Sequence, residues 1–263
     1  MVDFDNLLFR ASSMGDIMTG VEKGWSVDKS ITCQRKLVQI YRELTWGRRA
    51  NKTNKYTEKG TKVEENSITT YCRVKKTMYK KNDVRLTNNF FTGEFDLYEG
   101  VEILKANKII DIKSSYDWTT FPSICDKLEP KYDYQIHTYM DLTGASNGVI
   151  AHVLENNTPE AINKLKLFAK YEKGMLDSGG NESDAYIAKC VEIEKNHIYD
   201  IELFKKSLET FDELFEFHTS DWHYDIPIHQ RVHEIEVVRD EAKIEKMKNR
   251  VIECREWMKK NFN

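Results

Sequence analysis

The sequence predicts an α/β fold with helices on both sides of a mixed β-sheet. Segments with helical periodicity lie on either side of a central region, 71–114, that is rich in β-branched and aromatic residues alternating with a period of two. The 263 residues, 40% of them hydrophobic, are ample for a self-sufficient core. We therefore expect one domain over 1–263, with its core at about 57–155 and C-terminal helices and a late strand at 158–263.

The N-terminal part is predicted to be helical after a short strand or loop. A first helix opens in the polar residues 10–13, and a second covers 30–46, where Leu37, Ile40 and Leu44 recur at helical spacing. Gly47 ends that pattern. A third helix is expected from Thr57 to about 71.

The central region is predicted to form an antiparallel meander. Strands are expected at 71–79, 89–98 and 108–114, with turns at 82–83, 99–100 and 106–107.

The C-terminal part returns to helices, with two further strands. Helices are expected at 130–143, from Thr158 to about 171, and at 184–196 and 200–218, and strands are expected at 147–155 and 230–238. The last helix, from about 240, carries an apolar stripe that favours core packing over contact with a partner chain. Its members are Ile244, Met247, Val251, Cys254 and Met258.

Composition excludes several classes of protein. No apolar run approaches the roughly 20 residues of a membrane helix, so no membrane partner is expected. The first ten residues lack the features of an export signal. The five cysteines are scattered and lack C-x-x-C spacing, so no zinc or iron–sulfur site is expected. They are interpreted as buried thiols, which favours a location in the reducing cytoplasm.

The near-neutral net charge of −3 conceals a basic segment. Between Arg48 and Arg85, twelve Lys and Arg residues face only four acidic ones. Such a segment indicates a surface for a polyanion, because phosphates are contacted by Lys and Arg whatever the global charge. A solvated helix and hairpin is the alternative explanation.

Charged residues on an apolar strand are the main functional signal. In Lys108-Ile-Ile-Asp111-Ile-Lys113, Asp111 and Lys113 project to the same face of the strand. A buried charge is costly without a partner, so these two require each other, a metal or a substrate. A structural salt bridge is the simplest explanation of this pair taken alone.

Asp96 adds a second carboxylate to this pair, which indicates a metal site. It lies on the preceding strand of a predicted hairpin and can reach the same point as Asp111. Two carboxylates and a backbone carbonyl are oxygen ligands suited to Mg²⁺, for which Mn²⁺ can substitute. With a lysine positioning or helping to deprotonate a water, these groups suit hydrolysis of a phosphodiester.

These motifs resemble the PD-(D/E)-x-K nuclease superfamily. Asp96 and Asp111-Ile-Lys113 match its signature, with Asp in place of the commoner Glu before x-K. Gly60-Thr-Lys-Val-Glu64 is similar to the G-x-x-x-E helix element, and Gln135-Ile-His-Thr-Tyr139 to the Q-x-x-x-Y helix, of the RecB-like branch. That branch includes lambda-type and YqaJ-like phage recombination exonucleases. The resemblance runs over most of the chain and implies a restriction-endonuclease-like core.

The resemblance also implies residue roles. Asp96, Asp111 and the carbonyl of Ile112 would hold one or two metal ions, and Lys113 would act on the attacking water. Glu64 would be a metal ligand, directly or through water. Glu65 competes for that role, although the spacing from Gly60 favours Glu64.

Other residues are candidate contacts of substrate or lysine. Gln135 would orient Lys113 or a phosphate, and Tyr139 lies one turn beyond it, where packing against the sheet is the simpler role. Arg10, Ser12 and Ser13 resemble the element that holds a 5′ phosphate, with helix capping as the alternative. Ser114 and Ser115 are candidates for a further phosphate contact, with solvated loop polarity as the alternative.

The resemblance implies a Mg²⁺-dependent DNA exonuclease of phage type, acting 5′-to-3′ on linear duplex DNA in the cytoplasm of a bacterial host. Its expected partners are DNA ends, a single-strand annealing protein and further copies of itself in a ring. The alternatives are an endonuclease, a single-strand-specific RecB-like nuclease, and a DNA-binding module that has lost catalysis.

Overall fold

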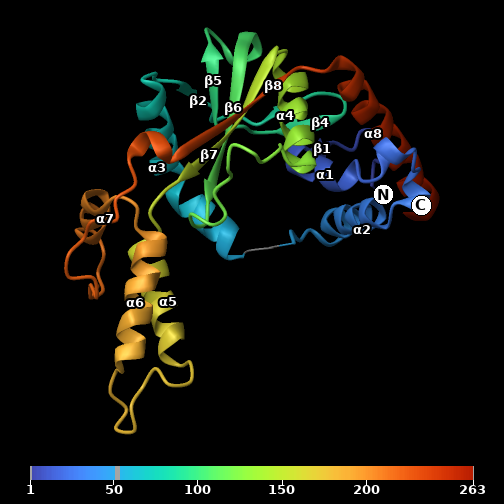
Figure 1. Ribbon diagram of the computed structural model, residues 1–263. Coiled ribbons are helices and arrows are strands. Elements are labelled where there is room, and N and C mark those ends of the chain that lie inside the picture. Colours follow the sequence, from blue (N-terminus) through green and yellow to red (C-terminus); the bar gives the residue numbers. More distant parts are fainter. Residues whose placement is uncertain (1, 51–53, 263) are drawn as a thin grey trace.

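The computed structural model describes residues 2–50 and 54–262, arranged around two β-sheets (Figure 1). The larger sheet has the order β2-β5-β6-β7-β8 and the smaller one the order β1-β4-β3. The strands are β1 (Phe9–Arg10), β2 (Lys80–Lys81), β3 (Leu86–Thr87), β4 (Phe91–Gly93), β5 (Leu97–Gly100), β6 (Ala106–Ser115), β7 (Asn147–Leu154) and β8 (Val232–Val238).

Eight α-helices are present among the described residues. They are α1 (Met14–Ile17), α2 (Ile31–Trp46), α3 (Lys55–Lys75), α4 (Pro130–Thr143), α5 (Pro159–Lys170), α6 (Asp184–His197), α7 (Ile201–Leu208) and α8 (Glu241–Phe262). None of these described helices is both long and apolar enough to span a bilayer.

The larger sheet is mixed. β5 and β6 are antiparallel, β6 and β7 are parallel, and β7 and β8 are antiparallel. The parallel step needs a crossover, which α4 supplies. Helices lie on both faces, so the predicted α/β class, with a mixed sheet, flanking helices and C-terminal helical additions, is confirmed.

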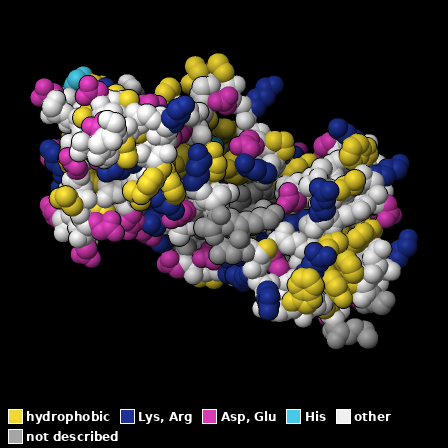
Figure 2. All heavy atoms as spheres, turned by 90° about the horizontal axis from the view of Figure 1, so that it is seen from below, with side chains coloured by type: hydrophobic (Ala, Val, Ile, Leu, Met, Phe, Trp, Pro, Cys, Tyr) yellow, Lys and Arg dark blue, Asp and Glu magenta, His cyan; other side chains and the backbone are white. Residues whose placement is uncertain are grey.

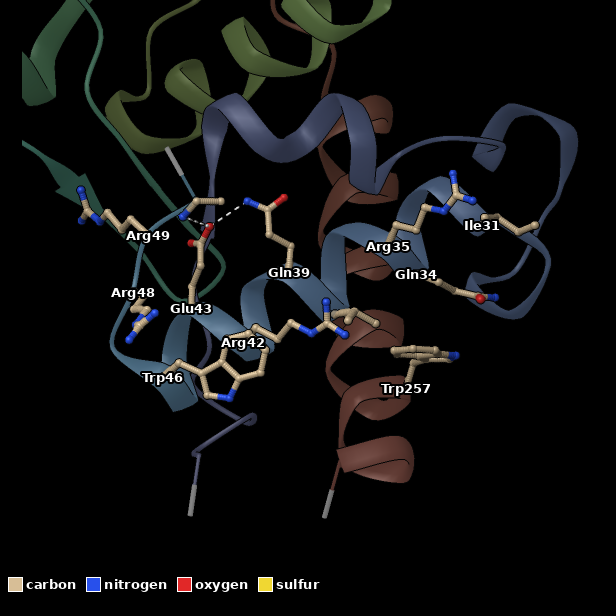
Figure 3. A pocket seen from close by; sticks show the side chains of 12 residues that line it. Ile31, Gln34, Arg35, Gln39, Arg42, Glu43, Trp46, Arg48, Arg49 and Trp257 are labelled. Carbon is tan, nitrogen blue, oxygen red and sulfur yellow. Dashed lines mark hydrogen bonds between the residues drawn. The ribbon is translucent and has the colours of Figure 1, made fainter. Parts of the chain in front are cut away.

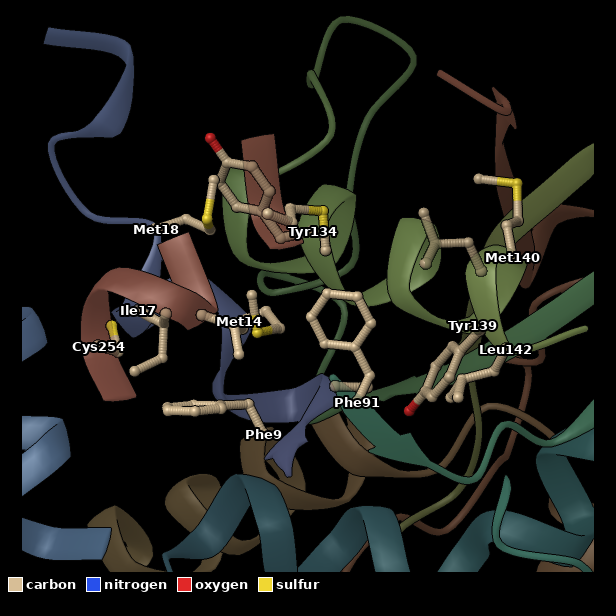
Figure 4. Close-up of a cluster of buried hydrophobic side chains, with 14 of the residues drawn as sticks. Phe9, Met14, Ile17, Met18, Phe91, Tyr134, Tyr139, Met140, Leu142 and Cys254 are labelled. Atoms are coloured by element: carbon tan, nitrogen blue, oxygen red, sulfur yellow. The ribbon is translucent and has the colours of Figure 1, made fainter. Parts of the chain in front are cut away.

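The two faces of the larger sheet are covered by different helices. α3 packs on the face that carries Ile110, Ile112 and Val149, with Tyr71 as its largest buried side chain. α4 packs on the opposite face, in the main core (Figure 4). That core also takes side chains from β1, α1, β4 and α8, among them Phe9, Met14, Phe91 and Cys254.

The C-terminal additions form two separate structures. α5 and α6 lie side by side and project away from the sheet, with α7 near their base (Figure 1). These three helices share their own apolar cluster, which includes Ile162, Cys190 and Phe204. By contrast, the stripe on α8 is fully buried against the body, as the sequence indicated. The predicted division at residues 57–155 and 158–263 stays a prediction.

Several sequence-based predictions are wrong in the centre of the chain. The segment 71–79 is not a strand, because α3 continues to Lys75 and β2 covers only two residues. The expected strand 89–98 is divided between two sheets, so the meander is replaced by separate pairings. Ala106 and Asn107 begin β6 and form no turn, and the helix expected at 200–218 ends at Leu208.

The thiol prediction holds for three of the five cysteines. Cys33, Cys190 and Cys254 are buried, whereas Cys72 is half-buried and Cys125 is exposed. All five are free thiols.

Candidate active site

The two aspartates meet where β5 leaves β6. The pairing of these strands starts at Leu97 opposite Ile110, so the N–H of Ile112 has no partner on β5. The Asp96 side chain accepts a hydrogen bond from that N–H at 2.5 Å. Asp111 lies beside it on β6 and is only 3% exposed. The backbone pairing thus brings both carboxylates to one point.

Lys113 joins these acids from the same face of β6. Its Nζ lies 2.5 Å from Asp111 Oδ2 and donates to Gln135 Oε1 at 3.3 Å. Burial alone would lower the pKa of Lys113, but the Asp111 carboxylate outweighs it and the pKa is raised above its ordinary value. The amine is therefore protonated at neutral pH and acts as a donor.

The donor set fits a divalent cation. Asp111 Oδ2 lies within ion-pair distance of Lys113 yet accepts no hydrogen bond of acceptable geometry. Burial, followed by repulsion from Asp111, raises the pKa of Asp96 to about 7. Two crowded acidic groups with a single amine between them need further positive charge when both are ionised.

The described side chains include no group of three His, Cys, Asp or Glu close enough to hold a metal by themselves. A cation here would depend on Asp96 and Asp111, supplemented by the carbonyl of Ile112 and by water.

Asp96, Asp111 and Lys113 line a surface cleft, and α3 adds Glu64 to that lining. This cleft, with a volume of about 450 Å³, is lined by Gly60 and Glu64 of α3 and by Asp96, Asp111 and Lys113. Glu65 is absent from its lining and forms an exposed ion pair with Lys81 instead. Successive helical residues point about 100° apart, which is why only one of the two glutamates faces the cleft.

α4 supplies the opposite wall of the cleft. Gln135 accepts from Lys113 and donates to the Tyr139 hydroxyl at 2.8 Å, so its amide is held between the two. The Tyr139 ring packs against Phe95, with ring centroids 5.6 Å apart. Tyr139 therefore has the packing role that the sequence favoured, while its hydroxyl lines the cleft.

The two serines after Lys113 differ in position. Ser114 lines the cleft and shares a 2.8 Å hydrogen bond with Ser67 of α3. Ser115 is buried, its hydroxyl has no hydrogen-bond partner among the described residues, and it is outside the lining of the cleft. Neither is therefore loop polarity in solvent, which was the alternative explanation.

The N-terminal element lies in a neighbouring hollow. Arg10 and Ser13 line that hollow together with residues of α2, whereas Ser12 is exposed. The capping alternative is wrong, because neither Ser12 nor Ser13 makes a side-chain cap hydrogen bond at α1 or at the 3₁₀ turn before it.

The structure adds residues that the sequence analysis missed. Tyr132 lines the cleft, with its ring centroid 5.0 Å from Lys113 Nζ, and Glu94 lines it two residues before Asp96. Spacing could have revealed Tyr132, which precedes Gln135 by one helical turn. Glu94 lies in the link between β4 and β5, where no strand alternation applies. Tyr56, Thr57 and Thr61 complete the wall that α3 provides.

The fold of this chain is shared with solved structures of exonucleases. The chain has this α/β fold, with acidic, basic and amide side chains gathered beside its central strand. No protein-family model and no curated protein matches the sequence.

Two proteins illustrate this likeness. A phage related exonuclease from Haemophilus somnus 129PT superposes with a TM-score of 0.64 at 23% identity, over 96% of this chain and 93% of that one. The alkaline exonuclease LHK-Exo from Laribacter hongkongensis gives a TM-score of 0.55 at 15% identity, over 96% and 92% of the two chains. A further structure of LHK-Exo, in complex with dAMP, gives 0.53 at 15% identity, over 98% and 94%. At these identities the likeness establishes a shared fold.

Proposed function

We propose that this protein is a Mg²⁺-dependent DNA exonuclease that degrades one strand of linear duplex DNA from its 5′ end. The observation that carries the proposal is the convergence of Asp96, Asp111 and Lys113 in one cleft, with Glu64 and Gln135 in the facing helices. A purely structural salt bridge would not need a second, half-buried carboxylate beside it, nor an open cleft in front.

The acidic residues would hold the cofactor, one or two Mg²⁺ ions, for which Mn²⁺ could substitute. Asp96, Asp111 and the Ile112 carbonyl would be its ligands, with Glu64 as a further ligand directly or through water. When bound, the ion neutralises charge on the phosphate and lowers the pKa of a water.

The other residues of the cleft have roles that do not require the metal. Lys113 offers a protonated amine to a water or to a phosphate oxygen. Gln135 fixes the direction of that amine, and Tyr139 fixes Gln135 in turn. Ser114, which lines the cleft, would contact a neighbouring phosphate oxygen.

The wider setting of the reaction is also part of the proposal. The resemblance to phage recombination exonucleases supports 5′-to-3′ polarity, a cytoplasmic location in a bacterial host, a single-strand annealing protein as partner, and assembly with further copies of the chain. The proteins that share this fold are exonucleases, and one of them, LHK-Exo, binds dAMP, which supports DNA as the substrate.

The test uses DNA of defined topology. Linear duplexes labelled at the 5′ or the 3′ end, closed circular duplexes and single strands are incubated with the protein and Mg²⁺, or with EDTA. We expect Mg²⁺-dependent loss of the linear duplex, with early release of the 5′ label and intact circles. An Asp111→Asn variant, which keeps the shape of the side chain, serves as the inactive control.

Each other result overturns the proposal in a recognisable way. Cut circles would identify an endonuclease, and loss of single strands alone would identify a RecB-like single-strand nuclease. Binding without cleavage in both Mg²⁺ and Mn²⁺ would identify a DNA-binding module.

A further inference from the structure

A second hollow lies between α2 and α8 and shares no lining residue with the catalytic cleft. It has a volume of about 600 Å³ and is walled by Ile31, Val38, Trp46 and Trp257 (Figure 3). We call it the α2–α8 groove. In Figure 2, hydrophobic side chains gather next to Lys and Arg side chains at the end of the molecule where α2 lies.

The α2–α8 groove carries uncompensated positive charge. Arg35, Arg42, Arg48 and Arg49 line it, and within residues 2–50 and 54–262 none of them lies within 4 Å of a carboxylate. The single acid in the lining, Glu43, already accepts hydrogen bonds from Gln39 and from the Ala50 N–H. Arginines that are gathered without counter-charges favour a polyanionic ligand.

The groove also carries an exposed indole. Trp46 is the last residue of α2, where Gly47 ends the helix with a φ of 61°, and 64% of the Trp46 surface is exposed. The Arg42 guanidinium lies 5.4 Å from its ring centroid. An exposed aromatic ring beside a cation offers a stacking surface for an unpaired base, with a phosphate contact alongside.

Trp257 contributes a second ring from α8. Its Nε1 donates to Asp28 at 2.9 Å, and its ring packs edge-on against Phe262, with centroids 5.7 Å apart. The indole is therefore held in one orientation at the end of the groove. Figure 3 shows the Arg42 side chain extending along α2 on the same side as both indoles.

The groove continues toward the catalytic cleft. Arg48, Arg49, Gln39 and Glu43 also line the neighbouring hollow that contains Arg10, so the two hollows adjoin. Arg10 lies on β1, which pairs with β4.

β4 in turn contacts the cleft. A Cβ at Gly93 of β4 would meet the Tyr139 ring at 2.6 Å, so this strand is in close contact with the cleft wall. Basic side chains therefore extend from Arg10, on the strand next to β4, to the far end of α2.

We propose that the α2–α8 groove binds single-stranded DNA, with its phosphates on the arginines and one base stacked on Trp46. The inference rests on the proposed function, because the strand that remains after exonuclease action is single-stranded. A duplex covers the faces of its bases, so an exposed indole favours the unpaired strand. A protein partner would need an acidic surface of its own to match four arginines.

The experiment measures binding without cleavage. Fluorescence anisotropy with labelled oligo(dT), in EDTA, is compared with the same measurement on an abasic oligomer of equal length. We expect Trp46→Ala to weaken oligo(dT) binding about fivefold or more while changing abasic binding little, because only the stacked base is lost. The exposed position of Trp46 makes unfolding of this variant unexpected, and a melting curve checks it.

A charge variant tests the phosphate contacts separately. Arg35→Gln combined with Arg42→Gln should weaken binding of both oligomers and reduce the slope of log K against log salt concentration by about 0.7 per lost contact. The matched controls are Trp118→Ala, another exposed indole, and Lys189→Gln with Lys205→Gln, which removes the same charge from ion-paired lysines on α6 and α7. Both controls should bind like the wild type.

Three results would overturn the inference: unchanged oligo(dT) affinity in both variants, tighter binding of duplex than of single strand that depends on Trp46, or altered oligomeric state with unaltered DNA affinity. The last would make this face an interface between copies.

Cleavage assays on the same samples separate the two proposals. An active enzyme with unchanged binding refutes the groove alone, and Trp46-dependent binding by an inactive protein refutes only the proposed reaction.

Discussion

At the scale of single residues, the site depends on groups whose charges are balanced only by one another. Asp111 and Lys113 are two residues apart on β6 and form a buried ion pair, and Asp96 adds a second acid. A buried lysine without a partner would lower the stability of the folded protein, because its charge is removed from water. Here its removal leaves a buried carboxylate without a partner, which is the more costly state.

Lys113→Ala should therefore abolish cleavage and also lower the melting temperature in EDTA. We expect a loss of about 2 kcal/mol, less than the roughly 3–5 kcal/mol typical of a fully buried pair, because the Lys113 side chain is about a fifth exposed. Calorimetry in EDTA measures the loss, and the double variant Lys113→Met with Asp111→Asn is the control that removes both charges. Full activity in Lys113→Ala would refute its assigned role.

Asp96 predicts a pH dependence of stability in the absence of metal. Its pKa is raised to about 7 in the folded protein, whereas an unfolded Asp titrates near 4. The folded state thus binds the extra proton between these values, so this stabilising contribution is full below about pH 4 and is lost as the pH rises through 7.

Melting curves in EDTA should show that the melting temperature of the wild type falls as the pH rises from 5 to 8. The melting temperature of Asp96→Asn should fall less over the same range. Mg²⁺ should stabilise the wild type at pH 8 more than it stabilises the variant. Equal Mg²⁺-dependent shifts in the two proteins would remove Asp96 from the ligand set.

Adjacent glutamates give a matched comparison on α3. Glu64→Ala should reduce cleavage by a factor of about ten or more, because its carboxylate faces the cleft, whereas Glu65→Ala loses only an exposed ion pair with Lys81. Such pairs contribute about 0.5 kcal/mol or less, so Glu65→Ala should resemble wild type in both melting and rate. Rates measured under identical Mg²⁺ conditions decide between the two glutamates, and a larger defect in Glu65→Ala would reverse the assignment.

At the scale of elements, the cleft exists because two helices approach the same strand from opposite faces. α3 covers the face of β6 that carries Ile110 and Ile112, and α4 covers the face that carries Ile109. The cleft opens where β5 ends its pairing with β6, so that neither helix has to bury the strand there.

Gly60 offers a test of α3 as a wall of the cleft. It lies inside the helix, and a Cβ added there would meet no atom within 4 Å. Gly60→Ala should therefore raise stability by about 0.5–1 kcal/mol through helix propensity. We expect cleavage to fall nonetheless, because the methyl group enters the cleft. Denaturant unfolding and rate measurements on one preparation show whether the two effects separate, and undiminished cleavage would mean that substrate does not approach this turn.

At the scale of the whole molecule, the basic segment is less uniform than its composition suggests. Lys75 and Lys81 are each ion-paired with a glutamate, and Lys59 is buried with its amine on the carbonyls of Tyr116 and Glu155. Lys52 lies outside the described residues. Lys55 and Arg73 have no carboxylate within 4 Å among the described residues, so they remain available for phosphate contacts.

Two double variants with equal charge change test this distinction. Lys55→Gln with Arg73→Gln should weaken duplex DNA binding for all sequences alike, and lower the salt slope by about 0.9 per lost phosphate contact. Lys75→Gln with Lys81→Gln should change both quantities much less, since those charges are already paired. Binding titrations at several salt concentrations, in EDTA, give the slopes. A sequence-selective loss of affinity would contradict the prediction.

The sequence determined the elements that have strong local signals. α4 spans 130–143 as predicted, because a proline at its first position and Gly144 after its end mark both boundaries. The alternation along β6 placed Asp111 and Lys113 on one face. Where local signals were weak the predictions failed, as in 71–79, where residues 71–75 instead form the last turn of α3.

Only the tertiary structure decided which distant residues meet. Strand order, the parallel pairing of β6 with β7 and the start of β5 only at Leu97 come from the packing of helices on both faces. Together they place Asp96 on the N–H of Ile112. The choice of Glu64 over Glu65 follows from the rotation of α3 on the sheet. Periodicity acts between near neighbours along the chain, whereas a cleft and a groove are made by contacts between segments far apart, which no local pattern specifies.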